Sequence, residues 1–84
     1  MVYDVNVKRV FKVLKTGRKY LNWIQNSVLE GEISEAGFER LKVALKKIIE
    51  EKEDSITFYS FRTTMYMKKY NMGKMKAEPD EVII

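Results

Sequence analysis

Apolar and polar positions divide the start of the chain into a strand-like stretch and a helical one. Residues 1–6 form a short, mostly apolar segment, and the chain begins only three residues before Asp4. Apolar side chains then recur at i, i+3, i+4 and i+7, the spacing of one helix face. These positions are Val7, Val10, Phe11 and Leu14. We expect Asn6 to cap this helix and Gly17 to end it.

Strand-forming residues return at positions 21–33, a stretch longer than an ordinary strand. This length predicts a hairpin that turns near Asn26. Gly31 in the second arm predicts a bulge or a close backbone approach. Ser34 is the expected N-cap of a second helix. Its apolar stripe is Phe38, Leu41, Ala44, Leu45, Ile48 and Ile49.

The last third of the chain is less regular. Residues 50–54 are expected to form a charged connector, and residues 55–61 are aromatic and β-branched, which predicts a strand. Residues 62–75 interleave Met and Tyr with Lys and receive no assignment. Residues 81–84 predict a short apolar strand that is buried against a partner subunit. Trp23 and Phe58 are expected in the core.

The order of these elements predicts a single ferredoxin-like domain over residues 1–84. This is an α+β fold of order βαββαβ, an antiparallel sheet backed by two helices, here with an extra C-terminal strand. Such a short chain buries only about 60% of its unfolded surface. It has no cysteine to add a disulfide. We therefore expect a homodimer to supply further burial.

No segment has the pattern of a secretion signal or a membrane span, so the expected location is the cytoplasm, without membrane contact.

The net charge of +4 conceals two basic segments without any acid, at residues 5–29 and 55–77. Clustered Lys and Arg neutralise phosphates, so two such segments predict a face for nucleic acid. A solvated lysine-rich surface is the plainer alternative. The candidate nucleic-acid-binding residues are Lys8, Arg9, Lys12, Lys15, Arg18 and Lys19.

The chain contains no histidine and no cysteine, which excludes conventional nucleophile–base pairs and sites that bind metal through imidazole or thiolate. Carboxylate chemistry with a hard cation remains. Asp4 is the only acid before Glu30, and it ends the first strand. Mg²⁺ takes one or two carboxylates, and a twofold dimer would bring two Asp4 side chains together. As alternatives, Asp4 is an ordinary cap or the ion-pair partner of Arg9.

Three segments carry a resemblance to a known family. They are Tyr3-Asp4-Val5, the sequence WIQNSVLEGEI at residues 23–33, and DSITFY at residues 54–59. In this order and spacing they resemble the CRISPR-associated Cas-two family. Its members are small, homodimeric, ferredoxin-like subunits of the spacer-acquisition complex. The turn at Gly73-Lys74 and the apolar last strand are also similar to the family.

The resemblance implies a dimer that bridges a CRISPR integrase subunit and holds foreign duplex DNA on its basic surface. It also implies an endonuclease that uses Mg²⁺ or Mn²⁺ and acts on RNA, single-stranded RNA included, or on DNA. The family's metal ligand, shared between subunits, corresponds to Asp4. Tyr3 would line the same catalytic site, and Arg9 would contact phosphate. The terminal strand at residues 82–84 would pair with the partner subunit.

Three classes of function stay open at this point. The first is the adaptation subunit, a DNA-binding scaffold with nuclease activity. The second is a metal-dependent endoribonuclease that acts alone, similar to toxin-type ribonucleases of the same fold. The third is a ferredoxin-like interaction module without an enzymatic role.

Overall fold

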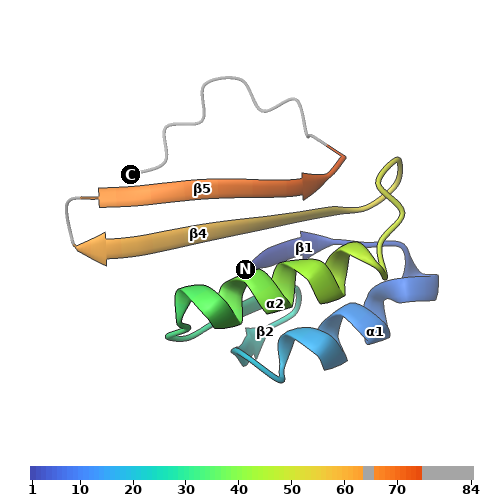
Figure 1. Cartoon of the computed structure of the whole chain (residues 1–84). Helices are drawn as coiled ribbons and strands as arrows, with labels where there is room; N and C mark the ends of the chain where they lie inside the picture. Colours follow the sequence, from blue (N-terminus) through green and yellow to red (C-terminus); the bar gives the residue numbers. More distant parts are fainter. Residues whose placement is uncertain (64–65, 75–84) are drawn as a thin grey trace.

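A computed structural model describes residues 1–63 and 66–74 of the chain (Figure 1). The apolar strand expected at residues 81–84 lies outside these residues. The elements are β1 (Val2–Asp4), α1 (Val7–Gly17), β2 (Asn22–Gln25), β3 (Val28–Glu30), α2 (Glu35–Lys46), β4 (Ser55–Thr63) and β5 (Tyr66–Gly73). In the part of the chain that is described, no helix is long and apolar enough to cross a bilayer.

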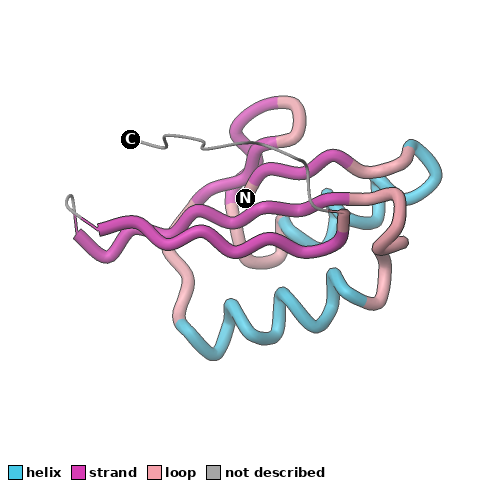
Figure 2. Tube along the Cα trace, turned by 90° about the horizontal axis from the view of Figure 1, so that it is seen from above, coloured by secondary structure: helices cyan, strands magenta, loops and turns pink. Residues whose placement is uncertain are grey.

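The strands form one sheet in the order β2-β3-β1-β4-β5, and every neighbouring pair is antiparallel. Both helices lie on one side of the sheet, next to each other (Figure 1, Figure 2). The first four strands have the ferredoxin-like order, which confirms the predicted α+β class. The fifth strand, β5, comes from a segment that the sequence left unassigned.

β1 lies between β3 and β4, so it is central although it is short. It pairs with β4 through Tyr3 opposite Ile56 and Asp4 opposite Ser55. Successive strand side chains point to opposite faces of a sheet. Tyr3 is buried with Ile56 on the helix side, and Asp4 is exposed. The end of β1 therefore presents the Asp4 carboxylate on the face of the sheet that the helices leave uncovered.

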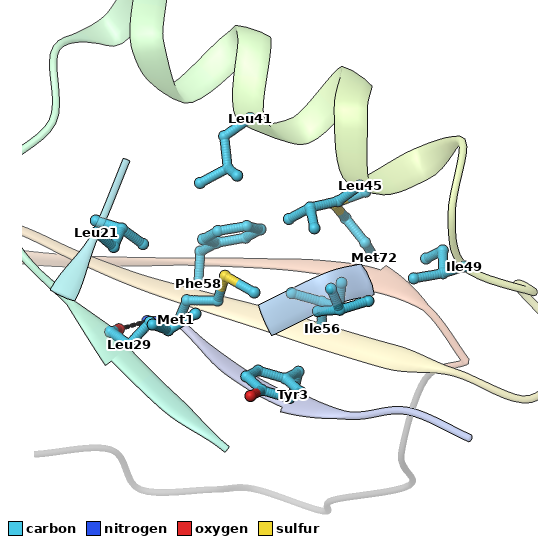
Figure 3. Packing of buried hydrophobic residues seen from close by; sticks show 11 residues of the cluster. Met1, Tyr3, Leu21, Leu29, Leu41, Leu45, Ile49, Ile56, Phe58 and Met72 are labelled. Atoms are coloured by element: carbon cyan, nitrogen blue, oxygen red, sulfur yellow. Dashed lines mark hydrogen bonds between the residues drawn. The ribbon is translucent and has the colours of Figure 1, made fainter. Parts of the chain in front are cut away.

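The core is a single cluster between α2, α1 and the helix side of the sheet. Figure 3 shows Leu41 and Leu45 of α2 pointing toward Phe58 of β4. Phe58 is buried as predicted, and Phe38 meets it edge to face with ring centroids 5.0 Å apart. Trp23 was expected in the core, and this prediction is wrong, because its side chain lies at the sheet edge and is 49% exposed.

The buried face of α1 also differs from the predicted one. Val7 and Phe11 are each 76% exposed. The core side consists of Val10, Val13, Leu14 and Gly17, which have the same helical spacing three residues further on. Gly17 suits this face because a Cβ there would lie 2.6 Å from Leu29 Cδ1. Two overlapping apolar stripes exist in the sequence, and packing selects the second.

Most predicted boundaries are confirmed. Asn6 Oδ1 accepts a hydrogen bond from Lys8 N at 2.9 Å, and Ser34 Oγ accepts one from Gly37 N at 3.0 Å, so both residues cap helices. The hairpin turns at Asn26, which has a φ of 40°. Gly31 was expected at a bulge or a close backbone approach. The bulge is wrong, since the irregularity in the pairing of β2 with β3 lies between Trp23 and Gln25, and a Cβ at Gly31 would lie 3.7 Å from Asn22 N, an ordinary contact.

Most of the stripe predicted for the second helix is core, although Ile48 and Ile49 lie beyond the end of α2 at Lys46 and Ala44 is not part of the core cluster. Leu41, Leu45 and Ile49 are buried, and Phe38 and Ile48 pack against them. The helix thereby covers β4 and β5, the strands that carry Phe58 and Met72 into the same cluster (Figure 3).

Candidate nucleic-acid interface and carboxylate site

Asp4 is the candidate metal ligand, and its carboxylate lies at the end of the central strand on the uncovered face of the sheet. Within residues 1–63 and 66–74, no three acidic side chains gather into a group that could hold a metal ion. Mg²⁺ typically binds one or two carboxylates and completes its shell with water and substrate phosphate. One exposed carboxylate fits half of a shared site, so the shared Asp4 metal site stays a prediction.

Tyr3 is the second candidate catalytic residue, and its side chain faces the other way. The ring is buried in the core, and its hydroxyl donates to the carbonyl oxygen of Asn26 at 3.4 Å. Burial raises the pKa of the Tyr3 phenol above its ordinary value. The structure does not bring the Tyr3 side chain to the face that carries Asp4, and its catalytic role stays a prediction.

Arg9, the candidate phosphate contact, already forms hydrogen bonds with two acidic side chains of the chain itself. Its Nε donates to Asp54 Oδ2 at 2.6 Å, and its Nη2 donates to Asp54 Oδ1 at 3.1 Å. The same Nη2 lies 3.0 Å from Glu53 Oε1. This two-pronged contact is the geometry that an arginine fork forms with a carboxylate. The hydrogen bonds to these acids raise the pKa of Arg9. Arg9 therefore has a structural role, whatever it does toward phosphate.

Asp54 is the centre of this arrangement, and its side chain has no exposed surface. Besides Arg9, the backbone N–H groups of Asn6 and Glu50 donate to its carboxylate at 2.9 and 2.8 Å. Burial alone would raise the pKa of Asp54, but the hydrogen bonds from Arg9, Asn6 and Glu50 outweigh it and lower the pKa to about 2. The carboxylate is thus held ionised in the folded chain.

The backbone of Asp54 extends the junction to the end of β5. Its carbonyl oxygen accepts a hydrogen bond from Lys74 N at 2.7 Å. Gly73 has a φ of 82°, and a Cβ there would collide with the same carbonyl. A glycine is therefore required at this position.

The sequence pattern does not single out Asp54, which it places in a charged connector. The usable local signal is its position directly before β4 and four residues after Glu50. The partner Arg9 is 45 residues away in sequence, so only the folded chain brings the two together.

The remaining candidate binding residues lie on the outer side of α1 or directly after it, and all are exposed. Among the described residues none of them forms an ion pair. Their charges are therefore uncompensated within this part of the chain. They are Lys8, Lys12, Lys15, Arg18 and Lys19. The structure separates these five from Arg9, which turns inward.

The sheet order and the two helices on one side of it place the chain in the class of ferredoxin-like α+β domains. The chain belongs to the CRISPR associated protein Cas2 family, whose model matches residues 1–69. The resemblance of the three sequence segments to this family is thereby confirmed.

Two relatives and one solved structure illustrate the similarity. The CRISPR-associated endoribonuclease Cas2 of Dictyoglomus turgidum is 55% identical over 83 residues, 99% of this chain and 95% of the relative. The protein of the same name from Thermotoga maritima is 51% identical over 78 residues, 93% of this chain and 90% of the relative. A crystal structure of Cas2 superimposes with a TM-score of 0.61 at 35% identity, covering 99% of this chain and 92% of that one.

The Asp54 junction predicts a large loss of stability in Asp54→Ala. The change leaves the Nε of Arg9 and two backbone N–H groups without their acceptor, so we expect the free energy of unfolding to fall by roughly 2–4 kcal/mol. Urea denaturation followed by circular dichroism measures it. Glu53→Ala is the matched control, since Glu53 is a surface acid on the same arginine and should cost less than about 1 kcal/mol. Equal losses in the two variants would contradict the assignment.

The lowered pKa of Asp54 also predicts how stability depends on pH. The unfolded chain binds a proton at Asp54 near the ordinary value of 3.8, whereas the folded chain resists protonation until about 2. The unfolded state therefore binds more protons in this window, and stability falls as the pH drops through it. We expect Tm to decline between pH 4 and pH 2, and Asp54→Asn to decline less over the same range. Parallel profiles would count against the junction.

Proposed function

We propose that this chain is a CRISPR adaptation subunit that works as a homodimer in the cytoplasm. It holds foreign duplex DNA on the exposed basic side of α1 and bridges an integrase subunit during spacer acquisition. The observation that supports this best is the row of uncompensated charges on α1. A solvated surface would be expected to mix acids with these bases, as α2 does by pairing Lys42 with Glu39 at 2.8 Å.

The dimensions of α1 suit a duplex backbone. Its 11 residues give a length of about 16 Å at 1.5 Å per residue. Duplex DNA carries one phosphate charge per roughly 1.7 Å of its axis, so one helix faces several phosphates. A homodimer presents two such helices, so it would contact a longer stretch of duplex DNA than one subunit does.

We further propose an endonuclease activity on RNA or DNA that depends on Mg²⁺ or Mn²⁺. The relatives from Dictyoglomus turgidum and Thermotoga maritima are named endoribonucleases. Asp4 of the two subunits would hold the metal ion, which supplies an activated water and neutralises charge on the scissile phosphate when bound. The exposure of Asp4 on the uncovered sheet face supports this role, because a second copy that covers this face would bring the two carboxylates together.

Apolar side chains on the same face support the dimer. Val2 and Phe61 are exposed there, and by strand alternation they share the face with Asp4. A small domain gains stability by covering such residues with a second copy.

A standalone endoribonuclease is the second candidate, favoured by the names of the relatives. The two candidates differ in what the carboxylate is needed for. As a scaffold, the chain needs its basic face and its partners; as a standalone enzyme, it needs Asp4 and the metal ion.

The basic face predicts a steep salt dependence of duplex binding. In a combined Lys8→Gln, Lys12→Gln and Lys15→Gln variant, we expect weaker binding and a log–log salt slope that is smaller by roughly one unit per lost phosphate contact. Fluorescence anisotropy of a labelled duplex at several salt concentrations measures both quantities. Lys46→Gln, Lys47→Gln and Lys52→Gln form the control, since these exposed lysines lie at and beyond the end of α2. An unchanged salt slope of duplex binding in the first variant would refute the proposed interface.

The carboxylate site predicts separable effects in Asp4→Asn. This exposed substitution removes the metal ligand, so we expect Mg²⁺-dependent cleavage of RNA and DNA to fall at least tenfold while duplex affinity is retained. The readouts are cleavage with Mg²⁺ or EDTA, and spacer acquisition in cells. Acquisition that survives in Asp4→Asn supports the scaffold, and acquisition lost together with cleavage favours the enzyme. Glu51→Gln, another exposed acid, is the control, and full cleavage by Asp4→Asn would refute the metal site.

A further inference from the structure

The exposed side of α1 carries apolar side chains that phosphate neutralisation does not require. Val7 and Phe11 are the most exposed large apolar residues in the described part of the chain. Close to the end of the helix, the half-exposed Trp23 lies on the edge strand β2. Exposed aromatic groups inside a basic surface are a feature that duplex backbone binding leaves unexplained.

The helix spacing surrounds Phe11 with cations. Residues three, four and seven positions apart share a helix face. Lys8 and Lys15 therefore lie one turn to either side of Phe11, and Arg18 lies two turns further along. The rise from Phe11 to Arg18 is about 10 Å, roughly that of three stacked nucleotides in one strand. Phe11 thus lies within a line of basic groups along one side of the helix.

Trp23 continues this line and is held in place. Its Nε1 donates a hydrogen bond to the carbonyl oxygen of Asn26 at 2.9 Å, which fixes the ring against the hairpin turn. The guanidinium carbon of Arg18 lies 5.8 Å from the ring centroid, within the range of a cation–π contact. Arg18 therefore connects the end of α1 to the indole. An aromatic group that is fixed before binding loses little entropy when a ligand stacks on it.

We propose that Phe11, Arg18 and Trp23 form a stacking platform for the unpaired bases of single-stranded nucleic acid, with Lys8 and Lys15 contacting its phosphates. This proposal rests on the nucleic-acid role proposed above and adds to the same helix a binding site for unpaired bases. Bases stack on aromatic rings with little regard to sequence, and flanking cations follow the backbone. The platform therefore binds single strands by a mechanism that a duplex does not use.

Charge and base stacking together favour a single strand over the other possible occupants. Residues 5–29 contain six basic residues and no acid, so a polyanion is the complementary partner. In a duplex the bases are already stacked on one another, and the aromatic rings would gain nothing. A second copy of this chain would bring two identical basic helices together, which like-charge repulsion disfavours.

The single tryptophan of the chain reports directly on the platform. Three probes are titrated while Trp23 fluorescence is followed: a thymidine oligonucleotide, a DNA duplex of equal length, and heparin as a polyanion without bases. We expect quenching by the single strand and at most a small change with the duplex or heparin. Equal quenching by heparin would overturn the proposal, because charge alone would then explain the signal.

Conservative pairs of variants separate stacking from charge and from folding. Phe11→Leu and Trp23→Leu should each weaken single-strand binding on the order of tenfold, and Phe11→Tyr and Trp23→Phe should restore it. Anisotropy of a labelled oligonucleotide measures affinity in all four. Phe11 is too exposed for its replacement to unfold the chain, so this pair decides the matter even if Trp23→Leu is unstable. Equal affinities for Phe11→Leu and Phe11→Tyr would overturn the platform.

The remaining outcomes distinguish this proposal from the proposed function. Salt-dependent duplex binding without any single-strand effect of Phe11→Leu refutes the platform and leaves the scaffold intact. Absence of binding to either nucleic acid refutes both. A change in oligomeric mass of Phe11→Leu, measured by light scattering, would identify the face as a contact between copies and would also refute the platform.

Discussion

The buried carboxylate of Asp54 is the constraint on which the rest of the structure depends. A buried charge is costly unless it is paired and hydrogen-bonded, and Asp54 has Arg9 and two backbone donors within 3.1 Å. Through these contacts it ties the start of α1, the segment after α2 and the start of β4 to one point. Its carbonyl adds the end of β5. A domain with a small core thereby gains a polar anchor that specifies how its elements meet.

The same anchor engages one of the six basic residues of the segment 5–29 and leaves the other five exposed. In the orientation that directs Arg9 toward Asp54, α1 also buries Val13 and Gly17 and exposes Phe11. Lysines at the other positions then point outward with no acid beside them in the described part of the chain. One inward ion pair and one outward basic face are therefore two consequences of a single orientation. The function proposed for the helix depends on a carboxylate that does not touch the ligand.

Local signals in the sequence predict most of the fold. They do not predict features that depend on contacts between residues far apart in the chain. Asn6, Ser34 and Asn26 are recognised because caps and turns depend on the residue and its immediate neighbours. The buried face of α1 is not recognised, since two stripes of equal spacing overlap and only tertiary packing selects one of them. β5 is not predicted because apolar and polar residues alternate only weakly along it. Its register comes from pairing with β4.

At the candidate site, too, the sequence predicts one part of the arrangement and the fold determines the other. Tyr3 and Asp4 are adjacent in sequence, and the resemblance to the family joins them in one site. The alternation of a strand is enough to separate them: Met1 and Tyr3 face the core, so Asp4 must face the other side. Tyr3 packs in the core on the helix side of β1, and the carboxylate next to it lies on the other side. Since the helices occupy only one side of the sheet, a group that completes the proposed metal site at Asp4 would have to approach from the uncovered face. The proposed metal site at Asp4 therefore depends on dimerisation through this face.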